Sequence, residues 1–210
     1  MKFDSSLLDS YRQQIFDLGF PENQWAGLVK YLEILSQKNE ELNLVSRQMT
    51  MKELIENHVI DCLLPLKMFP QGINICADLG TGGGFPGVIY ALAKPEIRFH
   101  FYEKSPLKQK YLTNLISGLN LSAEVRGEVE SHLSQADLVI ARGFKPVDVI
   151  LQMTSEFQKS KGKYFLLKGR LEKIQEECAQ ATQKNKSLKV VIEPLKSPVL
   201  DVERHLVVVG

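Results

Sequence analysis

The rhythm of hydrophobic and polar positions along this chain changes near residue 71. Over residues 25–35 apolar side chains recur at i, i+3, i+4, i+7 and i+10, the spacing of one face of a helix. Thr50 with Glu53 three residues later has the pattern of a capping box, which predicts the start of another helix. Strand-like alternation is absent before residue 71. Residues 1–70 are therefore predicted to form a helical N-terminal region.

After Gly72, short apolar runs alternate with helical stretches. The runs that predict strands are 73–80, 98–104, 122–127, 138–143, 163–169, 187–195 and 205–210. Strands that alternate with helices favour a mainly parallel sheet covered on both faces. The last two strands leave no room for a crossover helix, which predicts an antiparallel hairpin at one edge. Residues 71–210 are therefore expected to form an α/β domain around a seven-stranded, mainly parallel sheet.

Composition narrows the class of protein. The 210 residues are 44% hydrophobic and 24% charged, and the net charge of +1 provides no global field for a polyanion. Cys62, Cys76 and Cys178 form no C-x-x-C pair, which indicates free thiols in a reducing compartment. No signal-peptide core and no apolar run of roughly 18 residues is present. We expect a soluble cytoplasmic protein with no membrane segment.

A glycine-rich loop follows the first predicted strand, in the stretch "ADLGTGGGFPG". Glycines allow a ligand to lie against bare backbone, and open α/β sheets bind ligands beyond the carboxyl ends of their strands. Asp78, Gly80, Gly82 and Gly84 have the spacing D-x-G-x-G-x-G of loops that bind S-adenosylmethionine. These four residues are candidate donor-binding residues.

The same loop also matches the dinucleotide fingerprint G-x-G-x-x-G at residues 82–87. Pro86, however, removes one backbone N–H from the turn that would hold a pyrophosphate. S-adenosylmethionine has no phosphate and carries a sulfonium, which the acidic residue Asp78 would favour. The loop therefore favours the methyl donor, and an NAD(P)-dependent oxidoreductase is the alternative.

Two charged residues end the second and the fourth predicted strands. Glu103 is placed to accept hydrogen bonds from ribose hydroxyls, as acids at this position of adenosine-binding sheets do. Arg142 is placed where the guanidinium could hold the donor's carboxylate or contact the methyl acceptor. An ion pair of Arg142 with Glu130 or Asp148 is the structural alternative.

Several segments resemble one known family. They are "ADLGTGGGFPG", "VIARGF", "FLLKG", "ERHLVVV" and, in the N-terminal part, "NEELNLVS" and "HVIDCLLPL". In order and spacing these resemble the bacterial 16S ribosomal RNA guanine-N7 methyltransferases once called glucose-inhibited division protein B. The resemblance covers nearly the whole chain.

The resemblance implies a Rossmann-like class I methyltransferase core behind a small helical region, with S-adenosylmethionine as donor. It implies a guanine of the so-called 530 loop of 16S rRNA as acceptor, in free rRNA, the 30S subunit or an assembly intermediate. The donor contacts carried over from the family are Gly80, Phe85, Glu103, Val129, Glu130 and Arg142. Arg142 is the candidate catalytic residue, a monomer is expected, and a non-catalytic RNA-binding protein with this fold is a further alternative.

The sequence offers no strong acid–base constellation and no H-x-E or C-x-x-C metal pattern, so no metal is expected. Guanine N7 carries a free lone pair, so its methylation requires no base. His58 and Asp61 share a helix face and are expected to close the N-terminal region onto the core or to contact RNA. Residues 159–196 hold ten Lys and Arg against four Glu, a net of +6, which suits either an RNA-binding face or a solvated helix.

Overall fold

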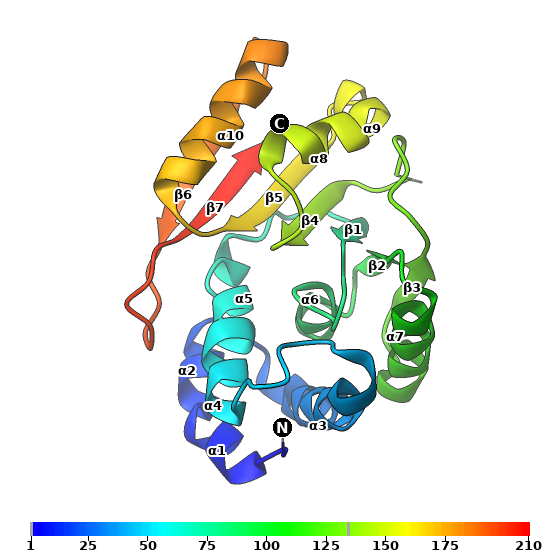
Figure 1. The fold of residues 1–210 in the computed structure, drawn as a ribbon, viewed down its shortest axis with the longest axis vertical. Coiled ribbons are helices and arrows are strands. Elements are labelled where there is room, and N and C mark those ends of the chain that lie inside the picture. The colour runs from blue at the N-terminus through cyan, green and yellow to red at the C-terminus, as the bar shows by residue number, and fades with distance from the viewer. Residues whose placement is uncertain (1, 134) are drawn as a thin grey trace.

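Seven strands form one twisted sheet in the computed structural model, which describes residues 2–133 and 135–210 (Figure 1). The strands are β1 (Ile75–Leu79), β2 (Arg98–Tyr102), β3 (Ala123–Arg126), β4 (Leu138–Arg142), β5 (Lys163–Lys168), β6 (Val190–Leu195) and β7 (Arg204–Val209). Their order across the sheet is β3-β2-β1-β4-β5-β7-β6. The order reverses between β1 and β4, so the carboxyl ends of these two strands flank the switch point of the sheet.

The predicted strand directions are confirmed. β1 pairs in parallel with β2 and β4, and β3 and β5 extend the parallel part on either side. β7 runs antiparallel to both β5 and β6, so the last two strands form the predicted hairpin at one edge. The fold is that of an α/β protein with a mainly parallel sheet.

Helices cover both faces of the sheet because strand side chains alternate between them. The helices that follow the sheet strands are α6 (Gly87–Ala93), α7 (Pro106–Leu119), α8 (Val147–Met153), α9 (Ser155–Lys159) and α10 (Leu171–Lys184). Phe99 and Phe101 point into the core on the side of α6 and α7. Val139 and Leu166 point into the core on the side of α8, α9 and α10. Figure 1 shows these two groups of helices on opposite sides of the sheet.

The N-terminal region is helical, as predicted. Its elements are α1 (Ser5–Ser10), α2 (Arg12–Asp17), η1 (Glu22–Gln24), α3 (Trp25–Leu42), α4 (Met51–Leu54), η2 (Ile55–Ile60), α5 (Asp61–Leu63) and η3 (Leu66–Met68). The predicted apolar stripe on α3 is buried at Trp25, Leu28, Leu32 and Leu35. The predicted capping box opens α4, and η2 is a π-helical segment that continues it into α5.

The N-terminal helices share one hydrophobic core with α6, α7 and the facing side of the sheet. Polar contacts cross the same boundary, since the buried hydroxyl of Tyr90 in α6 donates to the carbonyl of Cys62 in α5 at 2.9 Å. This packing places α3, η2 and α5 beside the carboxyl ends of the central strands. Within the described residues, no helix is both long and apolar enough to cross a membrane.

Candidate functional site

A cavity of about 450 Å³ lies at the carboxyl ends of β1, β2 and β3 and reaches the loop after β4. Its lining residues are Gly80, Gly82, Tyr102, Glu103, Lys104, Lys108, Gly127, Glu128, Val129, Phe144, Lys145 and Met153. We call it the glycine-loop cavity. Its volume and its mix of apolar walls with a few polar groups suit a small organic ligand.

Gly80 and Gly82 of the glycine loop line this cavity. The N–H groups of Gly80 and Thr81 both donate to the carbonyl of Tyr102, at 2.9 and 3.1 Å, which ties the loop to the end of β2. Gly82 has a φ of +57°, and a Cβ there would meet only the carbonyl oxygen of Gly80, at 3.6 Å. The Gly82 backbone is therefore exposed to the cavity with no side chain between them.

The later glycines of the loop serve packing. A Cβ on Gly84 would lie 2.7 Å from the hydroxyl of Tyr31, and a Cβ on Gly87 would lie 2.3 Å from Oδ2 of Asp78. The hydroxyl of Tyr31 donates to the carbonyl of Gly83 at 3.0 Å. Gly83 and Gly84 therefore allow the loop to pack against α3.

Asp78 lies beneath the loop and does not line the cavity. Its carboxylate is fully buried, Oδ2 accepts a hydrogen bond from the N–H of Gly87 at 3.1 Å, and Oδ1 has no partner among the described residues. Burial is the main reason that the pKa of Asp78 rises to about 7. Its contact fixes the turn into α6, so its effect on a ligand would be indirect.

Glu103 lines the cavity and is held by backbone donors. Oε2 accepts from the N–H of Gly82 at 3.1 Å, and Oε1 accepts from the N–H of Ser105 at 2.8 Å. The side chain is nearly buried, so its remaining lone pairs point toward a confined space. Val129, in the loop after β3, contributes an apolar wall. This arrangement can receive a sugar with vicinal hydroxyls beside an apolar ring.

Arg142 lies at the centre of a buried polar cluster beside the loop. Its Nη1 donates to Oδ2 of Asp61 at 2.7 Å and to the carbonyl of Asn57 at 3.0 Å, and its Nη2 contacts Nδ1 of His58. The guanidinium lies 5.7 Å from the ring centroid of Phe85, within range of a cation–π contact. The sequence-based alternatives for its ion pair were wrong, because Glu130 pairs with His132 and Asp148 pairs with Lys184.

The π-helical η2 segment supplies these partners of Arg142. It presents the Asn57 carbonyl and the His58 ring toward β4, and Asp61 follows at the start of α5. Burial, followed by the positive charge of Arg142, lowers the pKa of His58 to about 4, so the ring is neutral at pH 7. π-helical turns are frequent at functional sites. The prediction that His58 and Asp61 join the N-terminal region to the core is confirmed.

A second cavity of about 330 Å³ lies at the carboxyl ends of β4 and β5, and Arg142 is one of its lining residues. Its lining residues are Asp61, Arg142, Gly143, Leu167, Lys168, Gly169, Leu195, Arg204 and His205. We call it the Arg142 cavity. The Nε of Arg204 donates to Oδ1 of Asp61, so one carboxylate holds two guanidinium groups at its wall. The cavity can receive a planar polar group with acceptor atoms.

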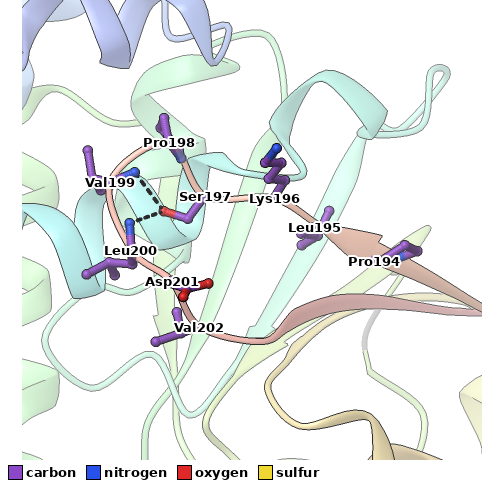
Figure 2. Close-up of a pocket in the computed structure, with 9 residues that line it drawn as sticks. All are labelled: Pro194, Leu195, Lys196, Ser197, Pro198, Val199, Leu200, Asp201 and Val202. Carbon is purple, nitrogen blue, oxygen red and sulfur yellow. Dashed lines mark hydrogen bonds between the residues drawn. The ribbon is translucent and has the colours of Figure 1, made fainter.

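A third hollow, of about 500 Å³, lies in the loop between β6 and β7 (Figure 2). All of its lining residues belong to the single segment 194–202. Oγ of Ser197 accepts hydrogen bonds from the N–H groups of Val199 and Leu200, at 3.3 and 3.1 Å, which shapes this loop (Figure 2). Because the hollow brings together no residues from separate elements, we assign it no ligand.

The structure brings together part of the predicted site. Four predicted residues line the glycine-loop cavity: Gly80, Gly82, Glu103 and Val129. The other five lie outside its lining: Asp78, Gly84, Phe85, Glu130 and Arg142. Sequence reasoning missed Phe144 and Arg204, although both lie in family-like segments, "VIARGF" and "ERHLVVV". Among the described residues, no group of three or more His, Cys, Asp or Glu side chains could hold a metal ion.

Comparison with known sequences gives consistent matches. A family model described as rRNA small subunit methyltransferase G matches residues 24–207. The ribosomal RNA small subunit methyltransferase G 1 of Bdellovibrio bacteriovorus is 51% identical over 205 residues, which cover 98% of this chain and 100% of that protein. The corresponding protein of a Marinomonas species is 35% identical over 185 residues and 86% of each chain.

Comparison with solved structures identifies the fold. A putative O-methyltransferase from Klebsiella pneumoniae has a TM-score of 0.55 at 11% identity, over 85% of this chain and 88% of that one. Aeropyrum pernix fibrillarin, in complex with S-adenosyl-L-methionine, has a TM-score of 0.52 at 14% identity, over 72% and 73%. These neighbours have the class I methyltransferase fold, which is therefore also the fold of this chain.

Proposed function

Because this chain belongs to the rRNA small subunit methyltransferase G family, we propose that it transfers the methyl group of S-adenosylmethionine to N7 of a guanine in 16S rRNA. The family match over residues 24–207 carries the proposal, and the glycine-loop cavity supports it. The acceptor is the guanine of the 530 loop that the family likeness implies.

The glycine-loop cavity is the proposed donor site. Gly80 lines the cavity against the Phe144 ring, the bare backbone of Gly82 would lie along the donor, and Glu103 would accept hydrogen bonds from the ribose hydroxyls. Val129, Phe144 and Met153 offer apolar walls for the adenine ring. Glu103 and Glu128 line the cavity together with Lys104, Lys108 and Lys145, so the choice of donor rests on the family match and not on the charge of the lining.

The Arg142 cavity is the proposed place of the target base. It lies beyond the carboxyl ends of β4 and β5 and is lined by Arg142. Arg142 and Arg204 offer donors for guanine O6, and Asp61 holds both in place. N7 of an A-form duplex lies in a deep, narrow groove, so the base must come from a loop or be unstacked.

When bound, the donor would supply an electrophilic methyl group on a positively charged sulfur. The N7 lone pair forms the new C–N bond as the C–S bond breaks, and the bonding electrons remain on sulfur. The positive charge moves from sulfur to the guanine. No proton moves, so the contribution of this chain is positioning, which can lower a barrier by roughly 7–11 kcal/mol.

Location and assembly follow from the substrate. A small-subunit rRNA enzyme of bacteria acts in the cytoplasm, on free rRNA, the 30S subunit or an assembly intermediate. A monomer is the expected active form.

A deletion strain tests the proposed function. Mass spectrometry of 16S rRNA from the strain should show loss of N7-methylguanosine in the 530 loop, and the wild-type gene should restore it. A Gly82→Ala gene should restore less. An unchanged N7-methylguanosine content in the deletion strain would refute the proposal.

A further inference from the structure

Six lysines lie at the end of the sheet opposite the two cavities. They lie in two short segments, "KSKGK" at 159–163 and "KNKSLK" at 184–189, and neither segment contains an acidic residue. We call Lys159, Lys161, Lys163, Lys184, Lys186 and Lys189 the distal lysine cluster. The sequence-based charge count grouped them with Lys168 and Lys196. Those two lysines lie at the carboxyl ends of β5 and β6, and therefore at the opposite end of the sheet.

The two segments converge on the amino end of β5. Lys163 is the first residue of β5, and Lys189 immediately precedes β6. Lys189 and Gly210 exchange backbone hydrogen bonds at 3.2 and 3.1 Å, and Cγ of Lys163 lies 4.0 Å from the Cβ position of Gly210. Figure 1 shows α9, the end of α10 and the C-terminus at one end of the molecule, away from the N-terminal helices.

Ordered turns present these lysines. Gly162 packs directly on Phe157, since a Cβ there would lie 2.3 Å from the ring, and its N–H donates to the Phe157 carbonyl at 3.0 Å. Oδ1 of Asn185 accepts from the N–H of Ser187 at 3.1 Å and from its hydroxyl at 2.7 Å. These hydrogen bonds fix the backbone from which the lysine side chains extend.

The charges of the cluster are largely uncompensated. All six lysines are exposed. Within the described residues, Lys184 forms an ion pair with Asp148 at 3.1 Å, and no other lysine of the cluster has a carboxylate within 4.0 Å. The whole chain carries only +1, so this edge differs sharply from the rest of the surface. Its chemistry suits a polyanion.

We propose that the distal lysine cluster binds phosphates of the rRNA substrate, at a site separate from the target base. This inference rests on the proposed function. The six residues of β5 span roughly 20 Å, so the cluster lies about that far from the Arg142 cavity. A single flipped base cannot reach both places, and the cluster therefore contacts RNA that flanks the target loop. Such contacts add affinity and orientation without reading sequence.

Four Lys→Gln substitutions together test the inference: K161Q, K163Q, K186Q and K189Q. A matched control carries K2Q, K30Q, K52Q and K67Q, which remove the same charge from the N-terminal region. The test measures binding to protein-free 16S rRNA across salt concentrations, together with kcat and KM for methylation and the Kd for S-adenosylmethionine. Melting curves confirm that both variants fold.

For the cluster variant we expect a raised KM for rRNA, with kcat and the donor Kd unchanged. The slope of log K against log salt should become shallower by about one for each phosphate that the protein no longer neutralises, up to about four. The control should keep the wild-type slope and KM.

A cluster variant that binds and methylates like the control would overturn the inference and leave the proposed function intact. Loss with 30S particles but not with free 16S rRNA would also overturn it, because the partner would then be a ribosomal protein. Failure of the wild-type chain to methylate either substrate would instead reject the proposed function.

Discussion

The backbone N–H of Gly82 donates a hydrogen bond to Oε2 of Glu103 at 3.1 Å, and both residues line the glycine-loop cavity. This contact joins the loop after β1 to the end of β2. It holds an acceptor carboxylate beside bare backbone before any ligand arrives. Preorganisation of this kind reduces the ordering that binding would otherwise require.

Gly82→Ala is expected to weaken S-adenosylmethionine binding by at least about tenfold, which corresponds to a loss of about 1.4 kcal/mol. The new methyl group would occupy space that faces the cavity. Gly72→Ala is the matched control, because Gly72 also has a positive φ, of +73°, and nothing lies within 4 Å of its Cβ position. Both variants should lose roughly 1–2 kcal/mol of stability from backbone strain. Titration calorimetry checks the prediction, and equal donor affinities of the two variants would contradict it.

Glu103→Gln is expected to weaken donor binding by roughly ten- to a hundredfold, since hydrogen bonds to a charged acceptor contribute about 1.5–3 kcal/mol. The amide keeps the size of the side chain and loses the charge that ribose hydroxyls would meet. Glu128→Gln changes a carboxylate in the same cavity for which no hydrogen bond is found within the described residues, and should have a smaller effect. If both variants lose affinity equally, the cavity's overall charge, and not the placement of Glu103, determines binding.

Arg142→Ala is expected to lower kcat by about a hundredfold, because a base misplaced by about 1 Å loses that much in rate. Asp61 would still be paired with Arg204, so the variant should fold. The donor Kd should stay at the wild-type value, since Arg142 lies outside the lining of the glycine-loop cavity. Single-turnover kinetics and donor titration separate the two effects. A wild-type kcat, or a loss confined to donor affinity, would count against the assignment.

His58 is expected to make folding stability depend on pH. Burial and the charge of Arg142 lower its folded-state pKa to about 4, below its ordinary value of 6.5. Between these two values the unfolded chain binds more protons, so the His58 contribution is full above pH 6.5 and is lost as the pH falls toward 4. Melting temperatures of the wild type and His58→Gln should therefore converge as the pH falls. His132→Gln, at an exposed histidine, is the control. A difference that is constant with pH would contradict the prediction.

Much of the fold could be predicted because its signals are local. The period of the α3 stripe, the capping box at Thr50 and the absence of a crossover before β7 each depend on neighbouring residues. Glu103 could be predicted as a cavity residue because it follows a strand whose carboxyl end had to lie at the ligand-binding edge.

The remaining parts of the site depend on contacts between distant segments. Asp61 lies 81 residues before Arg142 in the sequence. The two residues are brought together by a π-helical segment that no sequence pattern predicted. Likewise, the hydrogen bond from Tyr31 to Gly83 directs Gly83 toward α3, whereas other glycines of the loop face the cavity. The two ends of β5 lie at opposite ends of the sheet, so the basic residues counted together over 159–196 do not form one surface.

Methyl transfer to guanine N7 of 16S rRNA can be measured with a labelled donor. The purified chain is incubated with S-adenosylmethionine that carries a deuterated methyl group and with 16S rRNA from the deletion strain, free or in 30S particles. The nucleosides are then analysed by mass spectrometry. We expect deuterated N7-methylguanosine at a single guanine of the 530 loop, and much less of it with Gly82→Ala. Deuterium at a different base or atom, or none in the rRNA at all, would contradict the proposed function.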